Sequence, residues 1–268
     1  MTALSKLYEQ YKSLQLDKIQ NYDRYNELLL IHSSSAMEGS TLTLDETEML
    51  IEENATPKGK PLEHSLMIKD HYEALKYVIE QSKNINQISE PIIKKIGALV
   101  MHSTGGEYSS ALGTVDSRLG DFRLSASRAA GGSYYISHEK ILPMMNDLYQ
   151  NINKSINSIL SVDDIMSLSS YAHLQLLSIH PFIDGNGRSA RLLQNLILLK
   201  HKLPLLIIRH EHKTDYIAAI KQSREKEDVK PFQTFLEKEY IDHIQNEIDR
   251  AKAMSKGNSK GISFTINL

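Results

Sequence analysis

The chain of 268 residues is long enough to bury a sizeable core, and its 31 basic residues nearly balance its 33 acidic residues, giving a formal net charge of −2. This balance excludes an overall positive field that would attract nucleic acid or an anionic membrane, so any anion site must be local. The absence of cysteine excludes a disulfide framework, a thiolate metal site and a cysteine nucleophile, and no apolar run approaches membrane-spanning length, so we expect a cytoplasmic protein.

The N-terminal part is predicted to be helical. Apolar residues recur at helical spacing through residues 4–14 and again through 22–29, which predicts two helices, the second ending near Gly39, a natural C-terminal cap. Thr43 followed three residues later by Glu46 is a capping-box signature. We therefore expect a third helix to begin there and to end before a proline-containing loop.

The segment 103–137 breaks the helical pattern. It is rich in glycine, serine and alanine, lacks a helical period and contains Gly131-Gly132 as a turn signal, so we expect a loop with a short hairpin. Helical periodicity is present before and after it, in residues 67–78, 91–101, 141–152, 165–179, 187–200, 215–223 and 231–253. Eight or more helices with very little strand predict an all-α fold, a helical bundle that carries one hairpin. In residues 262–268, apolar and polar side chains alternate as in a short strand.

Residues 180–191 carry the chemistry. The helix before them must stop at His180, because Pro181 disfavours helical geometry in the residue that precedes it. A new helix is expected to start near Gly187, since the residues after it are mostly good helix formers. The stretch 185–187, Gly-Asn-Gly, therefore lies at a helix N-terminus, where free N–H groups and the positive end of the helix dipole bind anions.

Three kinds of side chain flank this predicted anion site. Arg188 and Arg191 project from one face of the first helical turn and offer planar donors to phosphate oxygens. Asp184 can cap the helix, and its carboxylate can also share Mg²⁺ with two phosphates, the usual way in which this ion binds. His180 has a side chain whose ordinary pKa of about 6.5 suits a general base. Such a set can orient a nucleotide and deprotonate an attacking hydroxyl group.

The same twelve residues match the motif of Fic (Fido) domain proteins, H-P-F-x-D/E-G-N-G-R-x-x-R, at every defined position. The resemblance extends over roughly residues 91–236. It implies a Fic-type helical bundle with a flap hairpin beside the active site. It also implies protein adenylyltransferase activity, the transfer of AMP from ATP to a Ser, Thr or Tyr hydroxyl of a target protein, with Mg²⁺ as cofactor.

The resemblance implies a role for each residue of the motif. His180 takes the proton from the attacking hydroxyl group, Asp184 holds Mg²⁺ between the α- and β-phosphates, and Phe182 anchors the loop in the core. The residues implied to bind phosphate are Gly185, Asn186 and Gly187 in the cradle, Arg188 on the β-phosphate side and Arg191 at the γ-phosphate.

Segments outside the motif also look like parts of this family. Phe122 and Arg123, with a second stretch around the glycine pair, resemble the flap that clamps a target segment by main-chain pairing. The flap residues of that second stretch are Gly131, Gly132, Ser133, Tyr134 and Tyr135.

Tyr216 and Ser223 fall where the family draws its adenine pocket from the helix after the motif, although both are ordinary helix residues and Ser223 stands where asparagine is common. His173 lies on the same helical face as His180, and we interpret it as structural because nothing pairs it with a carboxylate.

The stretch 34–39, Ser-Ser-Ala-Met-Glu-Gly, matches the inhibitory motif S/T-x-x-x-E-G/N that some Fic proteins carry before the core. The resemblance implies that Ser34 and Glu38 are regulatory and that Glu38 pairs with Arg191, which denies the γ-phosphate its partner. Removing one partner of a buried ion pair is costly, because the other charge is left unpaired, so such a pair can act as a latch. We expect low basal activity that Glu38→Gly releases.

With these interpretations, one folded chain divides into N-terminal helices with the inhibitory segment (1–62), a Fic-type core with flanking helices (63–254) and a C-terminal tail (255–268). The expected partners are ATP and a protein target whose identity the sequence does not give. Neither nucleic acid nor membrane is expected as a partner, and a homodimer is left open.

Three alternatives stay open at this stage. The same fold can transfer a phosphoryl or phosphocholine group, although the intact residues 185–188 favour AMP. A glutamate placed like Glu38 could instead position water for the removal of AMP from a target. The chain could also be a nucleotide-binding module without catalysis.

Overall fold

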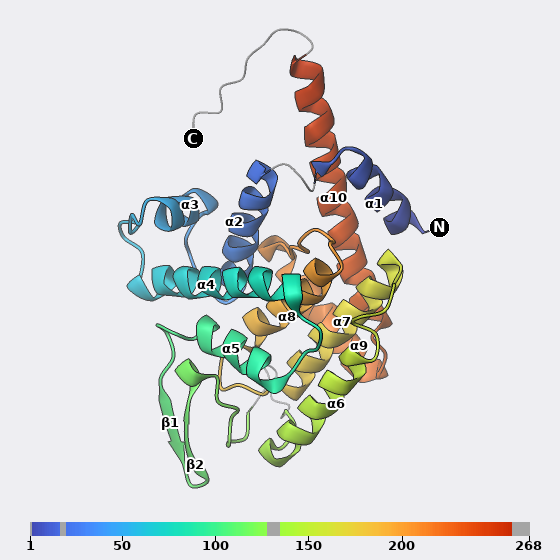
Figure 1. Ribbon diagram of the computed structural model, residues 1–268. Coiled ribbons are helices and arrows are strands. Elements are labelled where there is room, and N and C mark those ends of the chain that lie inside the picture. The colour runs from blue at the N-terminus through green and yellow to red at the C-terminus, as the bar shows by residue number, and fades with distance from the viewer. Residues whose placement is uncertain (1, 17–19, 128–134, 259–268) are drawn as a thin grey trace.

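Ten α-helices and one two-stranded hairpin form the computed structural model, which describes residues 2–16, 20–127 and 135–258 (Figure 1). The helices are α1 (Ala3–Ser13), α2 (Gln20–Ala36), α3 (Leu44–Glu52), α4 (Leu62–Asn84), α5 (Glu90–Val100), α6 (Ile141–Asn153), α7 (Val162–Ile179), α8 (Asn186–Lys200), α9 (Lys213–Lys226) and α10 (Lys230–Asn258). The strands are β1 (Glu107–Ser110) and β2 (Gly113–Asp116), and short 3₁₀ turns are η2 (Ser117–Leu119), η3 (His138–Lys140) and η4 (His210–His212). The expected all-α fold with one hairpin is confirmed for this part of the chain.

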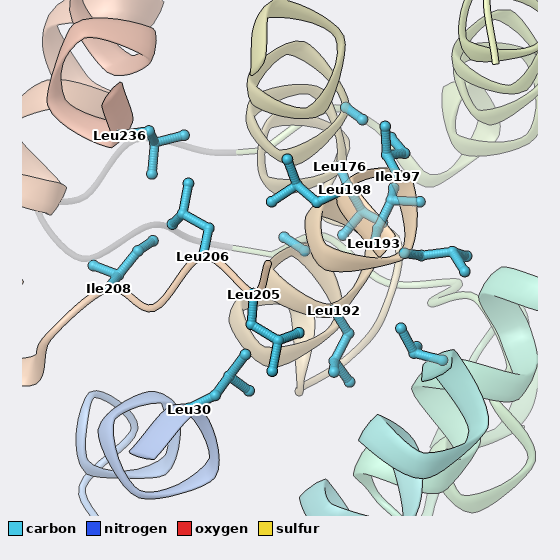
Figure 2. Packing of buried hydrophobic residues seen from close by; sticks show 14 of the residues in the cluster. Leu30, Leu176, Leu192, Leu193, Ile197, Leu198, Leu205, Leu206, Ile208 and Leu236 are labelled. Carbon is cyan, nitrogen blue, oxygen red and sulfur yellow. The ribbon is translucent and has the colours of Figure 1, made fainter. Parts of the chain in front are cut away.

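Helices α7 and α8 form the centre of the fold. Helix α8 is buried on nearly every side and lies against α7, α4 and α5, as fits a helix without a solvent-facing stripe. Each fully buried leucine stabilises the fold by roughly 2 kcal/mol, so the loop that joins the two helices rests on a firmly packed base. Figure 2 shows this core, which includes Leu176, Leu192, Leu193, Ile197, Leu198, Leu205 and Leu206.

Local signals explain where the helices begin and end. The Thr43 hydroxyl accepts a hydrogen bond from the Glu46 amide at 3.2 Å, and the Glu46 carboxylate accepts one from the Thr43 amide at 2.8 Å, so the predicted capping box opens α3. Helix α7 ends at Ile179, directly before His180, as Pro181 predicts.

The hairpin lies inside the segment predicted to contain one, but its turn is not the Gly-Gly pair. The antiparallel register pairs Ser110 with Gly113, so the turn falls between these residues. Gly113 has a φ of +131°, a conformation that favours glycine, which explains why the chain reverses there. The segments outside the described residues include the predicted flap tip, Gly131, Gly132, Ser133 and Tyr134, and the strand expected in 262–268.

The N-terminal helices pack directly on the core. Helix α1 lies along α10, and α2 lies against α4 and also meets α8 (Figure 1). The C-terminal end of α2 thereby comes close to the N-terminus of α8, where the motif residues are. In the described part of the chain, no helix combines the length and the apolar character needed to cross a membrane.

Candidate active site

The loop between α7 and α8 makes a tight turn at each of its ends. His180 caps α7 in the left-handed conformation, with φ 52° and ψ 59°, and Gly185 caps the start of α8 with φ 78°. A Cβ atom at Gly185 would lie 3.0 Å from both Val100 Cγ1 and Met101 Sδ. Glycine is therefore needed there for its conformation and for its small size.

The Asn186 side chain holds this loop in shape. Its Oδ1 accepts a hydrogen bond from the Phe182 amide at 3.0 Å, and its Nδ2 donates to the Phe182 carbonyl at 2.9 Å. The Phe182 ring is buried against Gly97 and Phe122, which agrees with its expected role as an anchor. Both polar ends of Asn186 thus form hydrogen bonds within the loop, and its part in the phosphate cradle stays a prediction.

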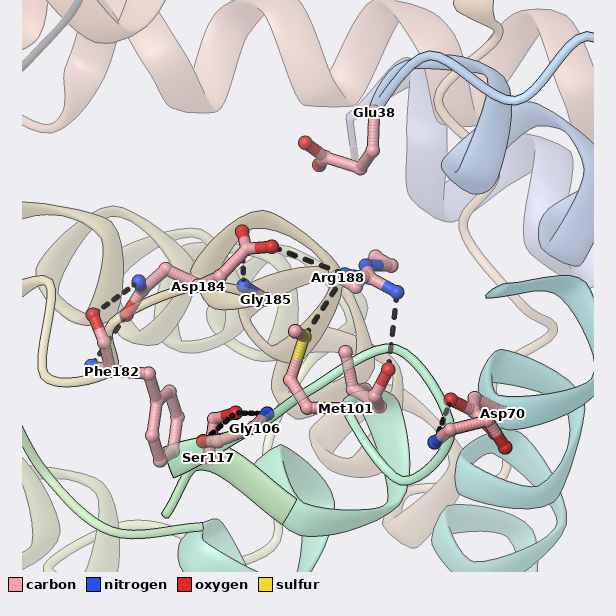
Figure 3. A network of polar contacts seen from close by, with 12 residues as sticks. Glu38, Asp70, Met101, Gly106, Ser117, Phe182, Asp184, Gly185 and Arg188 are labelled. Carbon is pink, nitrogen blue, oxygen red and sulfur yellow. Dashed lines mark hydrogen bonds and ion pairs between the residues drawn. The ribbon is translucent and has the colours of Figure 1, made fainter. Parts of the chain in front are cut away.

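Arg188 lies beneath the N-terminus of α8. Its Nη1 donates to the Val100 carbonyl at 3.1 Å, and its Nη2 lies 3.2 Å from Met101 Sδ and 4.0 Å from Asp184 Oδ2 (Figure 3). The buried Nε has no hydrogen-bond partner among the residues described. A guanidinium with a free donor, next to helix amides that lack intrahelical acceptors, suits an anionic group.

The Asp184 carboxylate faces solvent at the edge of this site. Its side chain is 66% exposed, and Oδ1 accepts a hydrogen bond from the Gly185 amide at 2.6 Å. Nowhere in the described part of the chain do three His, Asp or Glu side chains gather to hold a metal. A lone exposed carboxylate beside a phosphate site fits Mg²⁺ only if phosphate oxygens supply further ligands.

His180 lies at the other end of the loop and is partly buried. Its imidazole is stacked on the Tyr135 ring, with centroids 3.8 Å apart. Burial, together with the positive charges of Arg123 and Arg224, lowers the pKa of His180 to about 4. The ring is therefore neutral at cellular pH, the state in which it can accept a proton.

Glu38 follows α2 and reaches the N-terminus of α8. Its Oε1 lies 2.5 Å from Arg191 Nη2, and Arg191 also donates to the Ser34 hydroxyl at 2.6 Å and to the Ser34 carbonyl at 3.0 Å. A Cβ atom built on Gly187 would overlap Glu38 Oε1, so the carboxylate sits against the first turn of α8. Figure 3 shows Glu38 extending toward the loop. The expected Glu38–Arg191 ion pair is present.

Positive charges surround the Glu38 carboxylate. Burial alone would raise its pKa, but Arg191 foremost, with Arg188 and Lys213, holds that pKa below its ordinary value. Lys213 also donates to the Met37 carbonyl at 2.6 Å, which ties the turn after α2 to the start of α9. The Glu38 side chain is still 34% exposed, so the carboxylate can leave without opening the core.

Tyr216 is a core residue, and the expectation that it contacts adenine stays a prediction. Its ring packs against Phe232 and Phe235, and its hydroxyl lies 2.8 Å from His173 Nε2 and interacts with Arg191. The burial follows from the orientation of α9, which turns this position toward α7 and α10. His173 is fully buried, in keeping with a structural role.

Ser223 is likewise engaged inside the fold. It is buried, and its hydroxyl accepts a hydrogen bond from the Phe232 amide at 2.9 Å, at the start of α10. Its side chain therefore stabilises the α9–α10 junction.

Sequence reasoning assigned Arg123 to the flap but missed its buried network. Its Nε donates to the His180 carbonyl, Nη1 to the Ser125 carbonyl and Nη2 to the Ile136 carbonyl, each at 2.7 Å. Its own amide donates to the Pro181 carbonyl at 2.8 Å. Arg123 thus joins both arms of the flap segment to the loop between α7 and α8.

Asp70 also contributes to the site, and nothing in the sequence pattern indicated it. It is buried, and its carboxylate accepts hydrogen bonds from the Ser103 amide and hydroxyl, both at 2.7 Å (Figure 3). These bonds fix the chain just after α5, where Met101 contacts Arg188. No spacing rule relates two residues 33 positions apart, so the sequence alone held no signal for this contact.

Comparisons with known proteins agree with this geometry. Residues 87–198 match the Fic/DOC family, a span that includes the whole loop between α7 and α8. A protein adenylyltransferase Fic from Nematostella vectensis is 31% identical over 211 residues, which cover 77% of this chain and 45% of that protein. The chain thus spans less than half the length of this curated relative, and the same holds for a relative of the same name from Drosophila persimilis.

Solved structures share the fold. A Fic domain containing signaling protein from Bacteroides thetaiotaomicron superposes with a TM-score of 0.80 at 24% identity, over 94% of this chain and 97% of that chain. Fic-1 from C. elegans superposes with a TM-score of 0.73 at 24% identity, over 92% of this chain and 70% of that chain. At this level of identity the likeness establishes the architecture.

Proposed function

This chain is a Fic domain protein, and from that premise we propose that it transfers AMP from ATP to a hydroxyl group of a target protein. The proposal rests on one observation: two features lie at opposite ends of the short loop between α7 and α8. A neutral histidine lies at one end, and a helix N-terminus with a buried, partly unsatisfied arginine lies at the other. Relatives named protein adenylyltransferase support the same assignment.

Under this proposal, His180 is the general base. A ring nitrogen accepts the proton of the target hydroxyl while the hydroxyl oxygen forms a bond to the α-phosphorus of ATP. The bond between that phosphorus and the bridging oxygen of pyrophosphate breaks, so AMP is attached to the target and pyrophosphate leaves. A base with a pKa of about 4 gives little driving force for proton transfer, so positioning must supply most of the catalysis.

The start of α8 would hold the phosphates. The amides of its first turn and the Arg188 guanidinium can donate to phosphate oxygens, and Asp184 would bind Mg²⁺ together with those oxygens. When bound, the ion would neutralise phosphate charge. The flap segments around Arg123 and Tyr135 would pair with the main chain of the target.

Glu38 would restrain this reaction. Its carboxylate lies against the first turn of α8 and pairs with Arg191. A γ-phosphate that entered there would be repelled by this negative charge and could not form a hydrogen bond with the Arg191 guanidinium, which is already paired. Removal of the carboxylate frees both the space and the arginine. The ion pair is therefore proposed as an autoinhibitory latch.

The nature of the transferred group tests the proposed activity. The Glu38→Gly protein is incubated with Mg²⁺, candidate target proteins and ATP labelled at either the α- or the γ-phosphate, and the products are separated by denaturing electrophoresis. We expect label from the α-position only, and we expect the double variant with His180→Ala to give none. Label from γ only would instead indicate a kinase, and ATP binding without any label would indicate a binding module; either result overturns the proposal.

A further inference from the structure

The Tyr135 ring covers one face of the His180 imidazole. The two rings are nearly parallel, with centroids 3.8 Å apart and an interplanar angle of 10°. The Arg224 guanidinium lies over the Tyr135 ring, 5.5 Å from its centroid, and its Nε donates to the Ser178 hydroxyl at 3.1 Å. An aromatic ring and a cation from two different elements thus converge on the histidine.

The backbone around Tyr135 is fixed on both sides of this residue. Its amide donates to the Ser127 carbonyl at 2.9 Å, across the flap. The next carbonyl, that of Ile136, accepts from Arg123, and the same arginine donates to the His180 carbonyl. One buried guanidinium therefore sets the position of the stacking residue relative to the residue on which it stacks.

We propose that Tyr135 is a positioning residue for His180: its ring fixes the plane of the imidazole and shields one face from water, with Arg224 ordering the tyrosine. This inference rests on the proposed role of His180 as the base. The contact also links the flap to the base, because a target segment that shifts the flap backbone shifts the ring that holds His180. The specificity of the flap and the orientation of the base are then set by one side chain.

The effect of the Tyr135 ring can be measured through the pKa of His180. Arg123 and Arg224 face the imidazole and act with burial to lower its pKa to about 4, while Glu38 acts in the opposite direction. Loss of the tyrosine ring would admit water to the imidazole and weaken the effect of burial. The pKa of His180 should therefore report on the stack whether or not the protein is active.

An NMR titration of the histidine ring signals provides this test, with the His180 signal assigned by its loss in His180→Ala. In Tyr135→Ala we expect the pKa of His180 to rise by about 1. Tyr135→Phe keeps the ring and should titrate as the wild type does, and so should Tyr108→Ala, which removes an exposed tyrosine on β1. Arg224→Met leaves the flap sequence intact and should raise the pKa by a smaller amount.

An unchanged His180 pKa in folded Tyr135→Ala would overturn the proposal, as would equal shifts in the alanine and phenylalanine variants. In the Glu38→Gly background, we also expect Tyr135→Ala to lower kcat for AMP transfer about tenfold and Tyr135→Phe to retain it. If Glu38→Gly transfers no AMP, the proposed function fails while the titration still decides the role of Tyr135.

Discussion

Arg123 is a buried cation that is satisfied by carbonyl groups instead of by an acid. Its guanidinium donates to the His180 carbonyl at the end of α7 and to Ser125 and Ile136 in the flap segment. Helix C-termini carry partial negative charge, which stabilises a cation at this position. Burial lowers the pKa of Arg123, but an arginine stays charged at any physiological pH. The loop between α7 and α8 and the base of the flap are consequently held as one unit.

His173 is the clearest source of pH-dependent stability at the residue scale. It is fully buried, and burial lowers its pKa to about 3, against an ordinary value of about 6.5 in the unfolded chain. Below pH 6.5 the unfolded state binds a proton that the folded state does not bind. The free energy of unfolding should therefore fall by about 1.4 kcal/mol per pH unit between pH 6 and pH 4 from this residue alone.

The variant His173→Gln isolates this contribution, because glutamine is neutral and can still bond Tyr216 and Gln194. Urea unfolding of both proteins between pH 7.5 and pH 4.5 gives the comparison. We expect the wild type to lose about 2.7 kcal/mol more than the variant over that range. Parallel pH profiles would show that His173 is not held neutral in the folded state.

At the element scale, the approach of α5 to the loop between α7 and α8 depends on Gly97. A Cβ atom at this position would lie 2.6 Å from Phe182 Cζ and 2.7 Å from Cε1, so the helix can approach the anchor ring only with glycine there. Phe182 in turn is held by Asn186 and by a tilted contact with Phe122. Helix α5 thus determines how deeply the Phe182 ring, and with it the loop between α7 and α8, lies in the core.

Gly97→Ala brings two effects into competition. Alanine in place of glycine inside a helix stabilises by about 1 kcal/mol, whereas overpacking against a buried ring costs roughly 1 to 3 kcal/mol. Because the overlap is with a ring that is itself fixed, we expect a net destabilisation in thermal unfolding and a loss of AMP transfer. Gly106→Ala is the control, since no atom lies within 4 Å of its added Cβ and its stability should be unchanged. A stabilised, fully active Gly97→Ala protein would contradict this account of α5.

Elements with local signals were predictable from the sequence. The capping box of Thr43 and Glu46 located α3, and Pro181 located the end of α7. Helix α4 extends beyond the predicted 67–78 to Leu62–Asn84. The hairpin turn at Gly113 was missed because a single glycine gives no distinctive spacing.

At the scale of the whole molecule, the candidate site is assembled from segments far apart in the chain. The turn after α2, the flap segment and the start of α9 all meet the loop between α7 and α8. The motif identified the residues of that loop, and the resemblance identified Glu38 as the partner of Arg191. The contacts of Asp70, Tyr216 and Lys213 could not be predicted, because they depend on tertiary packing and not on any local pattern.

The proposed latch would make the N-terminal helices part of the proposed active site. Glu38 is held by Arg191, and Lys213 holds the turn that carries it, so release requires only a local shift of this turn. The Glu38 side chain is 34% exposed and pairs with the buried Arg191 guanidinium, and we propose that this pairing holds the basal state closed. The central claim is therefore that one carboxylate determines whether the site is productive.

The measurement that tests this claim most directly is the initial rate of transfer of α-labelled AMP by wild type, Glu38→Gly and Glu53→Gly. Glu53→Gly removes an exposed glutamate at the end of α3 and controls for the backbone effect of glycine. We predict a rate at least about tenfold above wild type for Glu38→Gly and a wild-type rate for Glu53→Gly. Equal rates for wild type and Glu38→Gly, with transfer still dependent on His180, would show that the ion pair does not restrain the enzyme.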